Sequence, residues 1–201
     1  MLNCLPRTSI RTAAGQAVAE VRARAGLLAL FVGSIWLVFL ADALLPFLHL
    51  GQLGVVPHTG RGLLGILFAP WLHANLGHIL ANTGGLLVLG WLTLWPRPQG
   101  FFEATLGAML GAGLLAWAAG DPGSVHIGAS GVVFGYASYL VARGYYARSF
   151  GAMAVALFVA ASYGVSMLLG LLPIYPGVSW QSHVGGALGG LLTARLCFRK
   201  A

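Results

Sequence analysis

The sequence predicts an all-α, polytopic membrane protein that forms a bundle of six transmembrane helices. Hydrophobic residues make up 58% of the 201-residue chain and charged residues only 7%, whereas about a quarter of the residues in a soluble domain are charged. Such a chain cannot cover itself with a wettable surface. Its apolar residues also fall into about six stretches near the ~20 residues that a membrane-spanning helix needs. We therefore expect one compact bundle within a membrane.

The predicted spans are separated by short breaks rich in proline, glycine or polar residues. The sequence WPRPQG closes the second span with two prolines, and PIYPGVSWQS precedes the sixth. A longer mixed segment, which ends at Trp71, separates the first span from the second. In chain order the spans cover about residues 26–50, 76–95, 101–119, 130–143 and 151–172, and a sixth begins near His183.

The chain divides into one bundle and two tails. The bundle is predicted to occupy residues 26–198. Residues 1–25 carry four arginines against the single acid Glu20, which predicts a basic cytoplasmic tail, with an organellar presequence as the alternative. Residues 199–201 form the predicted cytoplasmic C-terminal tail.

The basic residues predict the orientation of the bundle. Short cytoplasmic loops are enriched in lysine and arginine, and six spans place both tails, the second-to-third loop and the fourth-to-fifth loop on one side. Of the basic residues in the loops and tails, only Arg61 falls on the other side. We therefore expect an integral membrane protein with both termini cytoplasmic. A short chain without an appended soluble domain suits the inner membrane of a bacterium.

The net charge of +7 does not indicate a nucleic-acid partner. The basic residues are scattered at the ends of apolar runs, whereas a nucleic-acid interface needs a basic patch or stripe. Cys4 and Cys197 lie near opposite ends of the chain, without a second cysteine that would complete a metal or redox motif. Membrane lipids remain the expected surroundings.

Three polar residues in different predicted spans lie at one depth. Helix rise places Ser130, His183 and Asn82 each ~20 Å from the cytoplasmic end of its span, at ~1.5 Å per residue. In a hydrocarbon core ~30 Å thick, water could reach that level through a cavity open to the external side. Polar side chains are costly at such depth and normally mark function.

These residue types can support hydrolysis. A serine hydroxyl becomes a nucleophile when a neighbouring histidine takes its proton, and asparagine or histidine donors stabilise the oxyanion that follows. Ser130 lies in GASG, where glycines allow an exposed hydroxyl at a loop-to-helix junction. His78 and Asn82, four residues apart, share one helical face. In HVGGALGG, Gly186 and Gly190 form a GxxxG face that allows another helix to approach closely.

The HxxxxHxxxN pattern of His73, His78 and Asn82, the GASG around Ser130, and His183 followed by GGALGG together resemble the rhomboid family of intramembrane serine proteases. The resemblance covers about residues 26–198 and implies a rhomboid-like six-helix bundle. It implies a catalytic dyad in which Ser130 is the nucleophile and His183 the general base and acid. The implied oxyanion hole comprises His78, Asn82 and the Ser130 backbone amide, and the supporting residues are His73, Gly128, Gly131, Phe134, Gly186 and Gly190.

The resemblance also implies partners. The substrates would be transmembrane segments of other proteins, which enter laterally and are cut close to the outer face. No metal or organic cofactor is implied, and the oligomeric state stays open. Two departures from the family pattern stand out: Arg61 lacks the tryptophan that often precedes the arginine of the first external loop, and Phe134 replaces a tyrosine that stacks on the catalytic histidine.

Two other functions are compatible with parts of the sequence. A catalytically silent relative that binds membrane helices would lack the serine or the histidine, and both are present. A metal transporter could use the six histidines, but no intramembrane carboxylates or repeated ligand motif accompany them. His126, just before GASG, is expected to be a solvated loop residue, with a second proton carrier as the alternative.

Overall fold

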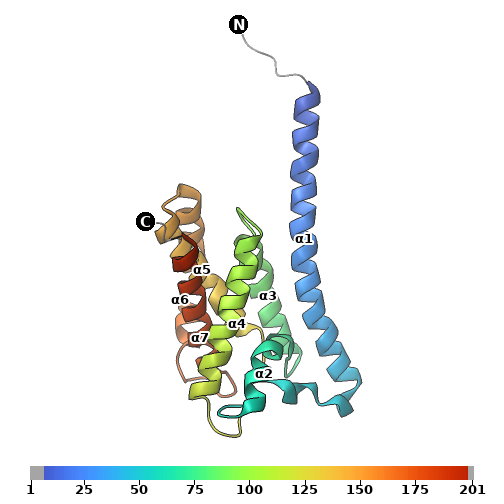
Figure 1. The fold of residues 1–201 in the computed structure, drawn as a ribbon, viewed down its shortest axis with the longest axis vertical. Helices are drawn as coiled ribbons and strands as arrows, with labels where there is room; N and C mark the ends of the chain where they lie inside the picture. The colour runs from blue at the N-terminus through green and yellow to red at the C-terminus, as the bar shows by residue number, and fades with distance from the viewer. Residues whose placement is uncertain (1–6, 199–201) are drawn as a thin grey trace.

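The computed structural model describes residues 7–198, and this part of the chain is all-α (Figure 1). Two 3₁₀ turns, η1 and η2, follow the first helix, and a third, η3, follows the second helix. The elements are α1 (Arg7–Leu44), η1 (Pro46–Leu48), η2 (Leu50–Leu53), α2 (Gly60–Phe68), η3 (Ala69–Trp71), α3 (Leu76–Thr93), α4 (Gln99–Ala119), α5 (Ser130–Ala147), α6 (Phe150–Gly170) and α7 (Trp180–Phe198).

Helices α3 to α7 coincide with the five later predicted spans to within a few residues, which confirms the polytopic helical fold. Four helices of the described chain are long and apolar enough to cross a membrane, namely α1 over Ala13–Leu44, α3, α4 and α6. Helices α5 and α7 have 18 and 19 residues and are less apolar, because they carry many small and polar residues. The number of six spans therefore stays a prediction.

Helix α1 is longer than the first predicted span. It runs unbroken for 38 residues from Arg7, through the predicted tail boundary at Gly26, and ends shortly before Pro46. Alanine, arginine and glutamate, which favour helices, extend it beyond the apolar stretch. Its N-terminal half rises past the other helices (Figure 1). The cytoplasmic location of residues 1–25 stays a prediction, and residues 199–201 lie outside the described part of the chain.

Two buried arginines hold the turn between α3 and α4. Arg24 of α1 donates to the Pro96 carbonyl (2.9 Å), forms an ion pair with Glu20 (2.6 Å), and lies 3.7 Å above the ring of Trp95. Arg143 of α5 donates to the Trp95 carbonyl. Together they attach α1 and α5 to the same turn.

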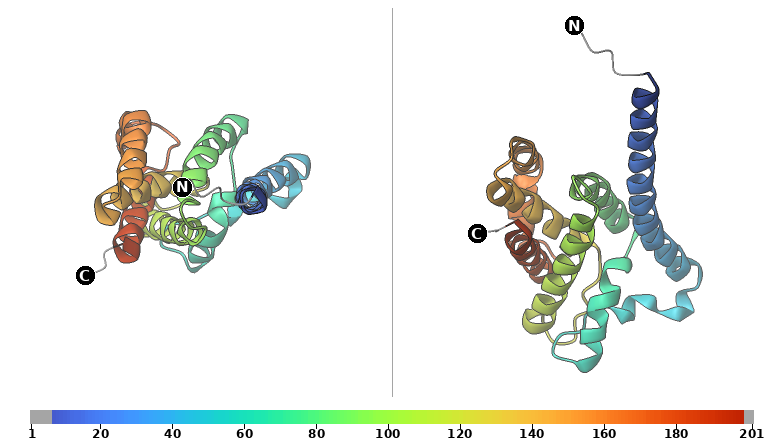
Figure 2. Two further views of the ribbon diagram at one scale, coloured as in Figure 1. Left: turned by 90° about the horizontal axis from the view of Figure 1, so that it is seen from above. Right: turned by 45° about the horizontal axis from the view of Figure 1, so that its top comes forward.

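Helix α7 lies against α5 along a seam of glycines. The views in Figure 2 show α5 and α7 side by side on the part of the bundle away from α1. A Cβ atom on Gly186 would overlap the carbonyl oxygen of Gly131, and one on Gly190 would overlap that of Gly135. The close approach expected of the GxxxG pattern is therefore present in the structure.

A second glycine seam joins α7 to α4. Gly185 approaches the carbonyl of Gly111, and Gly189 approaches that of Gly107, again with no room for a side chain. The sequence predicted a GxxxG face at Gly186 and Gly190 and no second face at Gly185 and Gly189. The doubled glycines of GGALGG instead give α7 two close faces, so that it is fixed between α4 and α5.

The mixed segment between α1 and α3 contains a short helix of its own. Helix α2 begins after Thr59, whose hydroxyl accepts from the Gly62 amide (3.0 Å) as an N-cap. Ile66 packs where α4 carries Gly113. Arg61 donates to the carbonyl of Gln52 (2.6 Å), so it is bonded within this segment without the tryptophan partner common in the family pattern.

Candidate active site

Ser130 and His183 meet in the structure although 53 residues separate them in sequence. Ser130 is the first residue of α5, as predicted. Helix α7 begins at Trp180, three residues before the predicted start of the sixth span, so His183 is its fourth residue. The Ser130 Oγ atom lies 2.9 Å from His183 Nε2. The glycine seam beneath them brings the two helices close enough for this hydrogen bond.

The second ring nitrogen of His183 determines which tautomer the site holds. Nδ1 lies 2.8 Å from the carbonyl oxygen of Gly170, at the end of α6. A carbonyl can only accept, so Nδ1 carries the proton and Nε2 is free to accept from the Ser130 hydroxyl. Phe134 stacks on the same ring, with centroids 4.1 Å apart and planes 9° from parallel. The phenyl ring thus occupies the stacking position despite lacking the tyrosine hydroxyl.

Asn82 and His78 project from one face of α3, as predicted from their spacing. Asn82 is buried, and its Nδ2 atom donates to His73 Nε2 (2.9 Å). His73 Nε2 also accepts from the amide of Ala129 (3.4 Å), and its ring packs edge-on against His78. These contacts tie α3 to the residue before Ser130, and they depend on tertiary structure that the sequence did not reveal.

Two glycines of GASG allow this close assembly. Gly128 has φ +117°, which disfavours other residues, and a Cβ atom there would lie 2.5 Å from His78 Nε2. A Cβ atom on Gly131 would lie 2.6 Å from that of Ala112 on α4. At both positions, where the chain enters α5, the packing therefore leaves no room for a larger residue than glycine.

The sequence of residues 60–200 matches the Rhomboid domain family, which covers more than half of the chain. The chain belongs to the rhomboid family. It is 40% identical over 174 residues to an uncharacterized protein of Mycobacterium bovis and to one of Mycobacterium tuberculosis, which corresponds to 83% of this chain and 72% of each relative. An uncharacterized protein of Mycobacterium leprae is 39% identical over 142 residues, 67% of this chain and 56% of that protein.

The Ser130 and His183 side chains of this rhomboid protein line a cavity of about 790 Å³. The cavity lies at the end of the bundle where α5 and α7 begin, between the loops at residues 120–129 and 171–179. His78 and Asn82 line it from α3. Polar groups from three helices thus converge on one space.

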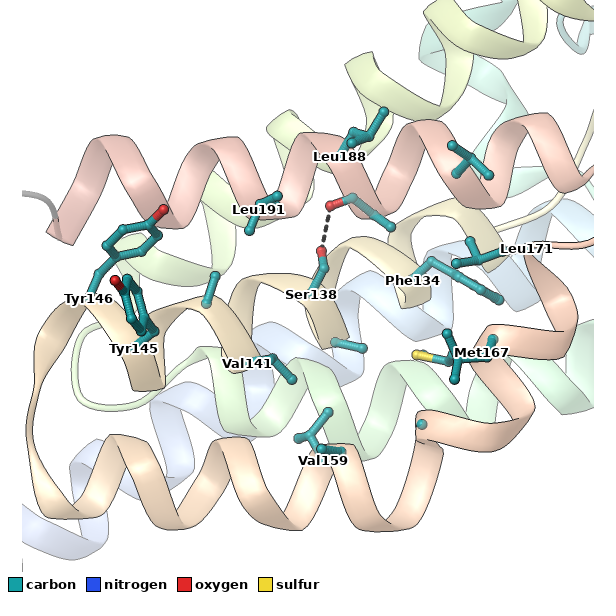
Figure 3. Close-up of a pocket in the computed structure, with 17 residues that line it drawn as sticks. Phe134, Ser138, Val141, Tyr145, Tyr146, Val159, Met167, Leu171, Leu188 and Leu191 are labelled. Carbon is teal, nitrogen blue, oxygen red and sulfur yellow. Dashed lines mark hydrogen bonds between the residues drawn. The ribbon is translucent and has the colours of Figure 1, made fainter.

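A second cavity of this rhomboid protein has different chemistry. An apolar groove of about 660 Å³ separates α6 from α7, with α5 as its floor (Figure 3). The Ser138 hydroxyl on its floor is already bonded to the Ala187 and Gly135 carbonyls (2.7 and 3.0 Å). Phe134 and Leu171 lie at one end of the groove and Tyr145 and Tyr146 at the other (Figure 3). Of these two cavities, the first contains the hydrogen-bonded pair of Ser130 and His183.

His126 is not the solvated residue that the sequence interpretation expected. Its side chain is buried, and its Nδ1 atom lies 2.6 Å from the hydroxyl of Ser179. Burial lowers the pKa of His126, against the opposing effect of Asp121, so the ring is neutral at pH 7. The expectation failed because a loop position says nothing about which other loop covers it.

No group of three or more histidine, cysteine, aspartate or glutamate side chains suitable for a metal ion occurs within residues 7–198.

Proposed function

We propose that this rhomboid protein is an intramembrane serine endopeptidase, which hydrolyses peptide bonds in or next to transmembrane segments of membrane-protein substrates. The observation that carries the proposal is the 2.9 Å hydrogen bond between Ser130 Oγ and His183 Nε2. A serine hydroxyl bonded to a neutral histidine of fixed tautomer is the arrangement that activates a nucleophile. The Gly170 carbonyl orients the ring, in place of the carboxylate side chain of a catalytic triad.

In the proposed reaction, Ser130 Oγ attacks the scissile carbonyl carbon while its proton passes to His183 Nε2. The resulting imidazolium keeps its Nδ1–H on Gly170, and the adjacent Phe134 ring favours the cation through its negative face. His183 then protonates the leaving amine. Water from the cavity, deprotonated at the same nitrogen, hydrolyses the acyl-enzyme and restores both residues.

The oxyanion hole of the proposal comprises Asn82, His78 and the backbone amide of Ser130. An amide nitrogen has two protons, and Asn82 uses one on His73 Nε2, which leaves the other for the substrate oxygen. The Ser130 amide lies in the first turn of α5, where no carbonyl of the same helix can accept from it. Such donors act by being oriented before the charge develops.

The orientation in the membrane is part of the same proposal. Both termini would be cytoplasmic and the cavity with Ser130 open to the external side, in the inner membrane of a bacterium. The distribution of arginines between the loops supports this orientation, and the mycobacterial relatives are consistent with a bacterial membrane. Substrates would be membrane proteins whose transmembrane segments enter from the lipid.

The purified protein in lipid vesicles, mixed with a single-span reporter substrate, tests the proposal. We expect the parent chain to cleave the reporter and to react covalently with a fluorophosphonate, and Ser130→Ala to do neither. Ser166→Ala, which removes an exposed hydroxyl bonded only within α6 (2.9 Å to Tyr163), is the matched control and should keep both activities. A parent protein that binds reporter helices but cleaves none of several reporters would favour the catalytically silent alternative.

We predict that Asn82→Ala lowers kcat by on the order of 10² to 10³, as expected for the loss of one oxyanion donor. KM should change little, because the donor acts on charge that develops only in the transition state. Asn82→Asp, which keeps the shape but removes both protons, should lose at least as much. Thermal unfolding of each variant separates this effect from loss of the Asn82–His73 bond, and unchanged kcat in a folded Asn82→Asp variant would contradict the role.

A further inference from the structure

The junction between the exposed loop at residues 171–178 and α7 is held by a residue from elsewhere in the chain. Ser179, the last residue before α7, forms its side-chain contact with His126 at 2.6 Å. The preceding loop is exposed over residues 172–178. The first turn of α7 is also bonded to the end of α4, where Gln181 Nε2 donates to the Ala119 carbonyl (3.3 Å). Within residues 7–198, however, the only side chain outside α7 that bonds Ser179 at this junction is His126.

Ser179 connects to the first turn of α7 in two ways. Its hydroxyl accepts from the Ser182 amide (3.2 Å) and donates to the Ser182 hydroxyl (2.8 Å). Its backbone carbonyl accepts from the amide of His183 (3.2 Å). Because the single hydroxyl proton is used on Ser182, the contact with His126 requires His126 Nδ1 to donate. Ser179 thus stands between His126 and the backbone of His183.

His126 is itself fixed in place. Its backbone pairs with Val55 through two hydrogen bonds (2.9 and 3.0 Å), which attach it to the segment before α2. Its Nε2 atom lies 3.0 Å from the Ser124 hydroxyl, which donates its proton to the Asp121 carbonyl (2.6 Å). The ring also fills the space beside Gly120, where a Cβ atom would lie 2.5 Å from Nε2. A buried side chain whose backbone is paired with Val55 and whose ring fills the space beside Gly120 is a firm anchor.

We propose that His126 is a positioning residue for the reaction: through Ser179 it fixes the first turn of α7, and so the distance of His183 from Ser130. The proposal rests on the proposed protease function. Ser130 is placed by α5, which follows directly from the same loop as His126. His126 lies four residues before Ser130, and Ser179 lies four residues before His183. The His126–Ser179 contact therefore joins the two segments that lead into Ser130 and His183.

The expected effect is on the rate of chemistry. A misplacement of ~1 Å in a catalytic group can cost ~10²-fold in rate, and the Gly170 and Phe134 contacts still hold part of the His183 ring. We therefore expect His126→Phe, which keeps a planar ring but donates no hydrogen bond, to lower kcat on the order of tenfold. KM should stay near that of the parent.

A conservative variant and a control separate positioning from general stability. In His126→Asn the side-chain amide can stand where Nδ1 stood, so this variant should recover most of the activity lost in His126→Phe. His58→Asn is the matched control, because His58 also bonds a loop to the end of α4 (3.1 Å to the Ala118 carbonyl) without contacting α7. It should behave as the parent.

The experiment measures reporter cleavage in vesicles and the rate of fluorophosphonate labelling of Ser130, for His126→Phe, Ser179→Ala and both together. If the two residues act through one contact, the double variant loses no more than the more damaged single variant, and labelling slows in parallel with kcat. Additive losses, or full activity of folded His126→Phe beside an active parent, would overturn the positioning role alone. A parent that neither cleaves nor labels at Ser130 would overturn the protease function and this inference together.

Discussion

Ser130→Ala, His183→Ala and the double variant are expected to lose the same activity, on the order of 10⁴- to 10⁶-fold in kcat. The two side chains share one hydrogen bond of 2.9 Å, and neither can perform its step without the other. Removing the second member of such a pair therefore costs little once the first is gone. All three variants should fold, because each truncation leaves the glycine seams between the helices intact.

The measurement is kcat for the single-span reporter in vesicles, with the thermal unfolding midpoint of each variant as the control for folding. The carbonyl that binds His183 Nδ1 belongs to the backbone of Gly170. None of the three variants changes Gly170, so each variant retains this carbonyl. Losses that add up in the double variant would show that Ser130 and His183 act independently, which the proposed mechanism does not allow.

Gly186→Ala is expected to destabilise the protein by about 1–3 kcal/mol, the usual cost of overpacking a tight contact. The new methyl group would meet the carbonyl oxygen and backbone of Gly131 on α5, and a backbone cannot move aside as a flexible side chain can. Gly186→Leu should be worse still. Activity should fall with stability, since α5 and α7 carry Ser130 and His183.

Gly84→Ala is the matched control for this prediction. Gly84 lies within α3, and a Cβ atom there would meet nothing within 4 Å. This change should be neutral or should stabilise the helix by up to about 1 kcal/mol, the difference in helix propensity between the two residues. Unfolding of the purified proteins in detergent compares them, and a Gly186→Ala variant as stable and active as Gly84→Ala would refute the seam.

The positions of helices α3 to α7 could be predicted because long apolar runs and proline-containing breaks leave few alternatives. The N-terminal extension of α1 could not, since residues before Gly26 are polar and their helicity comes from residue propensity rather than hydropathy. Helix α2 was also missed. It is short, and its position depends on packing against α4 at Gly113.

The residues of the candidate site could be predicted where the type of a residue and its spacing along a helix were enough to place it. Ser130, His183, Asn82 and His78 line one cavity, as the depth argument and the family pattern suggested. The contacts of His126 were missed, because they join loops that lie far apart in the sequence and have no periodicity to reveal them. The same holds for the bond of His73 to the Ala129 amide.

The glycine seams should also keep the distance between Ser130 and His183 independent of the surrounding lipid. A thicker or thinner bilayer is accommodated by tilting of transmembrane helices, and α1 and α6 expose many large apolar side chains on the surface of the bundle. Helices α5 and α7 instead meet backbone to backbone at Gly131 and Gly186, where neither can slide without collision. Changes in acyl-chain length should therefore tilt α1 and α6 while the distance between Ser130 and His183 stays the same.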